Sequence, residues 1–307
     1  AKVACMSTTI AFLGPAGTFT EAAMQRFAAD LGETTPLPVG SPKEALAAVR
    51  SGDADYACVA IENSVDGPVT ATFDALADGS PVQIYREVDL PVSFSILTRG
   101  KSAQEITTFS THPVAYQQVR GWLEENLPGV EYVPAASNGA AAQAVARGEV
   151  DAAAAPARAG EVFELDALAD NIADVEGATT RCVLVGPPGQ PTARTGHDRT
   201  SVIFTLPNEP GSLVGALQEF AHRGVDLTRI ESRPLRTVFG NYRFHADLIG
   251  HIDDQPVAEA LRALWLRAEE VVFVGSWPSA AATPKAQLDL ARLNQADEWV
   301  AKVRTGQ

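Results

Sequence analysis

The sequence has few cysteines and no long apolar segment, and each shortage excludes a class of protein. Its three cysteines, Cys5, Cys58 and Cys182, are an odd number without Cys-x-x-Cys spacing. This pattern excludes a disulfide framework and a cysteine zinc site, and it fits a reducing compartment. The apolar runs are far shorter than the roughly 20 residues that a membrane-spanning helix needs. The N-terminus lacks the charged and apolar regions of a signal peptide, so we expect a cytoplasmic protein.

Positive charge is also scarce. Lys and Arg number 24 against 38 Asp and Glu, which gives a net charge of −14. A chain of this charge without a basic cluster binds nucleic acid and anionic membranes poorly. The five histidines lack metal-ligand spacing, so no metal site is expected. We interpret Met6 as a candidate natural start, with residues 1–5 as a leader or an added segment.

Strand and helix signals alternate up to about residue 185. Thr18 and Glu21 have the spacing of a helix N-cap and its third residue, and Ser41 and Glu44 repeat it. The continuous apolar run at 56–61 is typical of a strand buried on both faces. The patterns predict helices at 18–30, 41–51, 69–79, 113–126 and 137–148, and strands at 8–13, 56–61, 82–88, 92–97 and 152–155.

A helix, a stopping glycine and a buried strand occur twice, around Gly52 and around Gly148. This repeated pattern indicates two similar α/β lobes, although such units also recur by chance in α/β proteins. Two lobes imply a cleft between them, which is a common place for a small-molecule site.

The Pro- and Gly-rich segment after residue 186 cannot continue a helix or an interior strand, so we expect a linker at 187–198. Beyond it, the predicted order is βαββαβ at 199–278, the ferredoxin-like arrangement. The tail at 279–307 holds one amphipathic stretch, 287–303, which we expect to pack on the body or on a partner subunit.

Four polar segments are candidates for ligand binding. One is 111–118 at the start of the central helix, where Gln118 points to the cleft or to solvent and His112 is a candidate proton carrier without a Ser/Asp or Cys partner pattern. The glycine-rich turn at 14–18 precedes a capped helix whose free N–H groups suit a carboxylate or phosphate, but it could also be an ordinary tight turn. Residues 62–64 follow a buried strand at its carboxyl end, where open α/β sheets bind ligands, although Asn and Ser also favour turns. Thr180 and Arg181 can donate hydrogen bonds to an anion, whereas Cys182 has the pattern of a buried core residue.

Together these segments resemble the prephenate dehydratase family, which converts prephenate to phenylpyruvate in phenylalanine biosynthesis. GPAGTFTEAA (14–23), AIENSVDGPV (60–69), THPVAYQQ (111–118) and TTRC (179–182) resemble its catalytic motifs, and PGSLVGAL (210–217) and IESRP (230–234) resemble those of its ACT regulatory domain. Ala60, Val114, Cys182 and Ser212 stand where the family usually has Pro, Gln, Phe and Ala. Six motifs in family order are highly specific.

The resemblance implies a bilobal α/β catalytic domain of the periplasmic-binding-protein type II fold at 1–186 and an α+β, ferredoxin-like ACT domain at 199–278. It implies no cofactor. The family's catalytic residues fall on Thr180, Glu62, Asn63, Ser64, Thr111 and Gln118. Thr180 is then the proton donor to the leaving hydroxyl. We expect Gly17, Thr18 and Arg181 to bind the substrate carboxylates through their N–H and O–H groups.

The resemblance also implies allosteric control by phenylalanine, bound where two ACT domains meet in a homodimer or homotetramer. The residues expected at that site are Asn208, Pro210, Gly211, Ser212, Leu213, Val214, Glu231, Ser232, Arg233 and Pro234. Other aromatic amino acids are further candidate effectors. Two alternatives stay open: a non-catalytic sensor of amino acids or anions, and the related conversion of arogenate to phenylalanine.

Overall fold

The structure is a computed structural model that describes residues 7–235, 240–280 and 290–306. The chain divides into two compact units, 1–190 and 191–307. Within the described residues, no helix has the length and apolar composition needed to cross a bilayer.

The first unit contains two lobes, each built on its own sheet. Lobe one has the strand order β2 (Thr34–Val39), β1 (Thr8–Leu13), β3 (Tyr56–Asn63), β11 (Thr179–Gly186) and β5 (Gln83–Pro91), with the short β4 (Gly67–Pro68) paired to β3. Its helices are α1 (Phe19–Ala28), α2 (Pro42–Ser51) and α3 (Thr70–Ala77). Strand β11 is antiparallel to both of its neighbours, and β1 is parallel to β2 and β3.

Local rules explain the helix ends in this lobe. The Thr18 hydroxyl accepts a hydrogen bond from the Glu21 N–H, and the Ser41 hydroxyl accepts one from the Glu44 N–H, so both predicted caps are confirmed. Helix α2 ends at Gly52, whose φ of 82° lies in the left-handed region that favours glycine.

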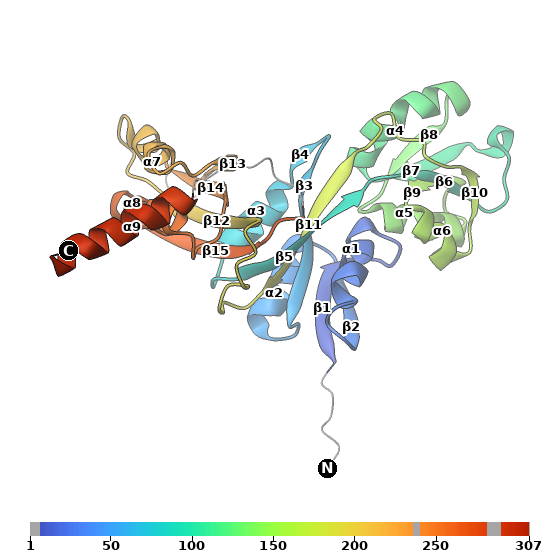
Figure 1. The fold of residues 1–307 in the computed structure, drawn as a ribbon. Coiled ribbons are helices and arrows are strands. Elements are labelled where there is room, and N and C mark those ends of the chain that lie inside the picture. The colour runs from blue at the N-terminus through green and yellow to red at the C-terminus, as the bar shows by residue number, and fades with distance from the viewer. Residues whose placement is uncertain (1–6, 236–239, 281–289, 307) are drawn as a thin grey trace, which may run out of the picture. The chain divides into compact units, whose positions relative to one another are not determined.

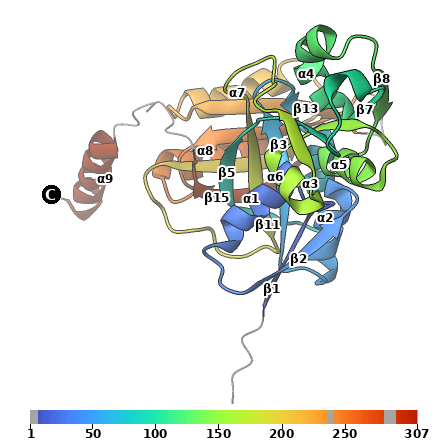
Figure 2. The same cartoon turned by 90° about the vertical axis from the view of Figure 1, so that its right-hand side faces the viewer.

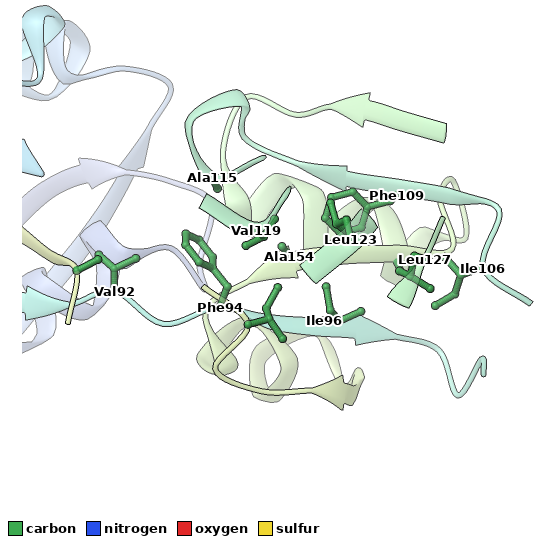
Figure 3. Packing of buried hydrophobic residues seen from close by; sticks show 13 residues of the cluster. Val92, Phe94, Ile96, Ile106, Phe109, Ala115, Val119, Leu123, Leu127 and Ala154 are labelled. Atoms are coloured by element: carbon green, nitrogen blue, oxygen red, sulfur yellow. The ribbon is translucent and has the colours of Figure 1, made fainter. Parts of the chain in front are cut away.

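Lobe two has the strand order β10 (Asp166–Ala169), β6 (Ser95–Thr98), β9 (Ala152–Ala155), β7 (Thr108–Thr111) and β8 (Glu131–Pro134). Its helices are α4 (Pro113–Asn126), α5 (Asn138–Arg147) and α6 (Ala157–Phe163), with a 3-10 turn at Ala103–Glu105. Its core packs α4 against the sheet, with Val119 and Leu123 of the helix near Phe109 and Ile96 of the strands (Figure 3).

The chain passes between the lobes twice, through β5 into β6 and back from β10 into β11 (Figure 1). Lobe one is therefore made from two separate stretches of sequence, and β11 lies between β3 and β5. The two predicted helix–glycine–strand units are confirmed as α2–Gly52–β3 and α5–Gly148–β9, one in each lobe.

Some elements differ from the prediction. The strand expected at 92–97 is β6 at Ser95–Thr98, because β5 continues to Pro91 and the residues between them connect the lobes. The sequence patterns missed β2, which carries two prolines. This strand tolerates them because it lies at the sheet edge, where an N–H can be lost without breaking an interior ladder. Strands β7, β8 and β10 and helix α6 were also missed; the longest of these has seven residues.

The second unit has the predicted βαββαβ order. Its elements are β12 (Asp198–Thr205), α7 (Ser212–Ala221), β13 (Leu227–Pro234), β14 (Tyr242–Ile249), α8 (Gln255–Arg267) and β15 (Glu270–Pro278), and the strand order is β13-β14-β12-β15. Both helices contribute to one core with the sheet, through residues such as Phe220, Leu264 and Phe204. Figure 2 shows the ribbons of α7, α8 and β15 of this unit. The predicted amphipathic tail includes α9 (Leu290–Thr305); residues 287–289 of it lie outside the described residues.

Candidate active site

A cavity of about 250 Å³ lies between the two lobes of the first unit. Lobe one contributes residues of β3 and β11 and the start of α1, and lobe two contributes the starts of α4 and α5. The lining is mostly apolar and includes Phe19 and Phe94, whose rings meet edge-on at 5.5 Å. Its polar members are Thr18, Thr20, Asn63, His112, Gln118, Ser137, Asn138 and Thr180, and no described Lys, Arg, Asp or Glu lines it.

Asn63 and Thr180 face each other across β3 and β11. The register pairs the two residues, and Asn63 Nδ2 donates to Thr180 Oγ1 at 2.9 Å. The Asn63 amide cannot be reversed without loss, because its Oδ1 accepts the N–H groups of Val65 at 2.8 Å and Asp66 at 3.1 Å. Thr180 Oγ1 therefore accepts from Asn63 and keeps its own proton available to donate.

A bulge in β3 shapes this wall. Arg181 pairs with Glu62 and Cys182 with Ala60, so β3 carries one extra residue, Ile61, at this point. As a result Ala60 and Asn63, three positions apart, both line the cavity, together with Thr180 and Cys182 of β11. Cys182 and its neighbour Cys58 are fully buried, and Cys182 is a core residue as expected.

Arg181 and Glu62 lie on the other side of these strands and do not line the cavity. Arg181 makes a two-pronged ion pair with Asp89, at 2.8 and 2.9 Å, and lies 3.6 Å from Glu62 Oε2. Burial opposes the charge, but the hydrogen bonds that Arg181 donates to Asp89 and the charges of Glu87, Asp89 and Glu62 raise the pKa of Arg181 above its ordinary value. The expected contact between Arg181 and a substrate carboxylate therefore has no support from its placement.

The glycine-rich turn serves lobe packing more than ligand contact. Gly17 has a φ of 84°, and a Cβ there would lie 2.9 Å from Ala159 Cα of α6 in the other lobe. Its N–H donates to Glu21 Oε2 at 2.6 Å, and Gly17 does not line the cavity, contrary to our expectation of a carboxylate contact. Thr18 lines it, but its hydroxyl proton is donated to the Leu13 carbonyl at 2.9 Å.

Of the other residues expected at the site, one lines the cavity and two do not. Gln118 lines the cavity and is 3% exposed. Thr111 is buried beneath the wall, where its hydroxyl donates to the Ala154 carbonyl at 2.8 Å and lies 3.3 Å from Asn138 Oδ1. Asn138 does line the cavity, and its Oδ1 accepts the N–H of His112 at 3.2 Å. Ser64 is exposed, and its hydroxyl accepts the N–H of Thr179, next to Thr180.

His112 lines the cavity as the N-cap of α4. Its Nδ1 accepts the Val114 N–H at 3.3 Å, which places the ring proton on Nε2 when the imidazole is neutral. Burial lowers the pKa of His112, and the nearby charge of Asp66 partly opposes that shift. A neutral His112 can donate one hydrogen bond from Nε2.

Three helix N-termini meet at the cavity, those of α1, α4 and α5. N–H groups in a first turn have no carbonyl partner within their helix, and the helix dipole adds partial positive charge. At α1 and α5, the cap hydroxyls of Thr18 and Ser137 accept the N–H groups of Glu21 and Ala140. At α4, Pro113 has no N–H and the Val114 N–H is already bonded to His112. The capping patterns of α1 and α5 were readable in the sequence, but their convergence depends on how the lobes pack.

In the second unit, a smaller cavity of about 130 Å³ lies beside the start of α7. It is lined by three of the predicted effector residues, Asn208, Ser212 and Leu213, and by Tyr242 and Gly240, which were not predicted. Glu231, Ser232, Arg233 and Pro234 lie on the edge strand β13 and do not line it, nor do Pro210, Gly211 and Val214. Among the residues that the structure describes, no group of His, Cys, Asp and Glu is arranged to hold a metal ion.

Comparisons with known proteins agree with this architecture. Residues 10–190 match the family model described as prephenate dehydratase, and residues 200–266 match the ACT domain. The prephenate dehydratase of Corynebacterium glutamicum is 59% identical over 308 residues, covering 97% of each chain. The chain belongs to the prephenate dehydratase family.

Similar solved structures include a prephenate dehydratase and a protein described with a different activity. A prephenate dehydratase from Arthrobacter aurescens, in complex with L-Phe, is 41% identical with a TM-score of 0.88, and the match covers 97% of this chain and 100% of that one. A protein described as GqqA, a novel type of quorum quenching acylase, is 31% identical with a TM-score of 0.78, covering 88% of this chain and 98% of that one. Solved structures similar to this chain are thus described with more than one activity.

Proposed function

We propose that the cavity converts prephenate to phenylpyruvate, with Thr180 as the proton donor to the leaving hydroxyl. The observation that carries this proposal is the hydrogen bond from Asn63 Nδ2 to Thr180 Oγ1, 2.9 Å long. It leaves the threonine proton free to move toward a ligand in the cavity. A hydroxyl is a weak acid in water, so this role requires a fixed, dry position, which the 9% exposure of Thr180 provides.

In the proposed step, carbon dioxide and the hydroxyl group leave the ring together. The bond between the ring carbon and the carboxylate breaks, its electron pair completes the aromatic ring, and carbon dioxide leaves. The bond between the opposite ring carbon and the hydroxyl breaks at the same time, and the proton of Thr180 converts the leaving hydroxide to water. Asn63 stabilises the negative charge that develops on Thr180 Oγ1, in the manner of an oxyanion hole. One proton from solvent restores Thr180, which matches the net uptake of one proton in the reaction.

The two carboxylates of prephenate find donors without a cationic side chain. The first-turn N–H groups of α1 and α5 and the Nε2 proton of His112 meet around the cavity. Donors of this kind are uncharged, so they can bind the substrate anion although the protein carries a net charge of −14 and few cations. Phe19, Phe94 and Val92 supply an apolar surface for the ring.

The same geometry argues against acyl hydrolysis, the activity named for the GqqA structure. A threonine nucleophile needs a neighbouring base that removes its proton. The partner of Thr180 is the Nδ2 donor of Asn63, which cannot accept a proton. This arrangement favours proton donation by Thr180 over nucleophilic attack.

The test is to incubate the purified protein with prephenate and to follow phenylpyruvate by its absorbance. Steady production of phenylpyruvate is expected, with arogenate run in parallel to compare the keto acid with the amino acid. A protein that binds prephenate without consuming it is a sensor, and the proposal then fails. An N-acyl homoserine lactone assay on the same sample tests the acylase activity.

We also propose that phenylalanine inhibits this reaction by binding to the ACT unit between two copies of the chain. The Arthrobacter aurescens structure, which is 41% identical, contains L-Phe. In this chain, the small cavity beside α7 combines polar groups of Asn208 and Ser212 with the apolar Leu213, which suits an amino acid. We expect a homodimer or homotetramer that acts in the cytoplasm.

A further inference from the structure

We propose that Asp66 is a positioning residue that orients Gln118 so that its carbonyl oxygen accepts a hydrogen bond from the leaving hydroxyl; this inference rests on the proposed function. Asp66 lies in the turn between β3 and β4 in lobe one, and Gln118 lies on α4 in lobe two. Gln118 Nε2 donates to Asp66 Oδ2, so this hydrogen bond joins the lobes beside the cavity.

The charge of Asp66 fixes which way the amide points. A carboxylate only accepts hydrogen bonds, so it selects the Nε2 end of Gln118 and leaves Oε1 at the other end. Gln118 is 3% exposed, and its Oε1 is buried without a hydrogen-bond partner among the described residues. A buried acceptor without a donor costs free energy, so this atom is a site for a donor that the described residues do not supply.

Prephenate offers one such donor. Its two carboxylates and its ketone accept hydrogen bonds, and its ring hydroxyl is the only group that donates. The unpartnered Oε1 therefore selects the hydroxyl, whereas the proton of Thr180 is aimed at the oxygen of the same group. The leaving oxygen would be held from both sides, and a hydrogen bond from it to Oε1 makes it a better proton acceptor.

A single hydrogen-bond network connects these groups. Asn63 donates through Nδ2 to Thr180 and accepts through Oδ1 from the Asp66 N–H at 3.1 Å, and the Asp66 carboxylate holds Gln118. The proton donor on lobe one and the acceptor on lobe two are thus oriented by one amide and one carboxylate. Asp66 itself is exposed, so its carboxylate keeps most of its hydration while it holds a buried partner.

The test compares Asp66→Ala with Asp53→Ala, a matched change at an exposed aspartate in the turn after α2. We expect Asp66→Ala to lower kcat about tenfold with KM unchanged within about twofold, and Asp53→Ala to change neither. Asp66→Asn, which can still accept from Nε2, is expected to retain an intermediate kcat. Binding of phenylpyruvate, which lacks the ring hydroxyl, should be unaffected in all three variants.

A double-mutant cycle with Gln118→Ala separates positioning from a structural role. If Asp66 acts through Gln118, Asp66→Ala lowers kcat by less than about twofold in the Gln118→Ala background. An undiminished tenfold loss there, a matching loss of phenylpyruvate affinity, or full kcat in Asp66→Ala would overturn the inference. Absence of prephenate turnover in the unchanged protein would instead refute the proposed function, so the two failures are distinguishable.

Discussion

Asn63 Nδ2 and Thr180 Oγ1 are 2.9 Å apart on directly paired positions of β3 and β11. Because Asn63 Oδ1 is held by two backbone N–H groups, the direction of this hydrogen bond is set by the fold and not by the ligand. The polarity of the pair is the basis of the first two predictions.

Replacing Thr180 by Val keeps the shape of the side chain and removes the hydroxyl. We expect kcat for prephenate to fall by about 10²–10⁴-fold, the usual contribution of a positioned acid. Thr180→Ser should retain part of the rate because it keeps a proton donor. Initial rates and thermal melting of both variants are measured together, and near-native turnover in a folded Thr180→Val protein would remove Thr180 from the proton-donor role.

Replacing Asn63 by Asp changes the direction of the hydrogen bond with little change in shape. A carboxylate accepts the Thr180 proton instead of donating to Thr180, so we expect kcat to fall by about 10²–10³-fold, as for the loss of an oxyanion donor. Asn126→Asp, at an exposed position on α4, is the matched control and should leave kcat unchanged. An active Asn63→Asp enzyme would show that the direction of this bond is immaterial.

Arg181 is predicted to support stability. Arg181→Leu would leave Glu62, Glu87 and Asp89 near one another without their shared cation, and Glu87 has a fully buried side chain. Breaking a buried ion pair typically costs about 3 kcal/mol, and the partial exposure of Arg181 reduces that figure. Urea denaturation should show the loss, whereas a variant of native stability that has only a raised KM would return Arg181 to substrate binding.

Asp151 is predicted to stabilise lobe two in a pH-dependent way. Its carboxylate accepts hydrogen bonds from Lys101, from the hydroxyl and N–H of Thr107 and from the Thr108 N–H, which lower its pKa well below the ordinary value. Because the pKa of Asp151 is lower in the folded than in the unfolded protein, its ionised form stabilises the fold at pH values above the unfolded pKa of about 3.9. This contribution is lost as the pH falls from there through the folded pKa. Asp151→Asn should therefore lower the free energy of unfolding by about 2 kcal/mol at pH 7, and less below about pH 4. An equal difference at both pH values would contradict this origin.

Asn208 is predicted to take part in inhibition by phenylalanine and not in turnover. Asn208→Ala removes a polar group from the cavity beside α7, so it should raise the phenylalanine concentration needed for half-inhibition several-fold. When phenylalanine is absent, kcat and KM should be unchanged. The coupling at stake is of the order of 1–3 kcal/mol, as is typical of allostery. Removal of residues after 190 gives a second test: a folded, active catalytic unit that is still inhibited would place the effector site elsewhere.

The sequence predicted those parts of the fold that depend on local rules. The caps Thr18 and Ser41, the stopping glycines Gly52 and Gly148, and the βαββαβ order of the second unit are all present. For the helix that ends at Gly148 the sequence left Ser137 and Asn138 open as the cap, and the cap is Ser137. Each of these features depends on residues close together in the chain. The short edge strands were not predictable in this way, because their pairing and not their composition makes them strands.

At the site, the sequence identified Asn63, Gln118 and Thr180, which line the cavity, together with Glu62 and Arg181, which do not. Strand alternation was the available signal, since residues adjacent to Asn63 and Thr180 point to the opposite face of a sheet. The roles of Gly17 and Asp66 could not be predicted, because both depend on partners in the other lobe, Ala159 and Gln118.

The position of β11 between β3 and β5 has a consequence for how the protein is made. All of lobe two is synthesised before β11 leaves the ribosome, so its sheet can form while lobe one still lacks a central strand. Until then, β3 and β5 present unpaired edges that are prone to pair with other chains. The strand that ends this exposure also carries Thr180, so the proposed proton donor reaches its place at the same moment as the sheet is completed.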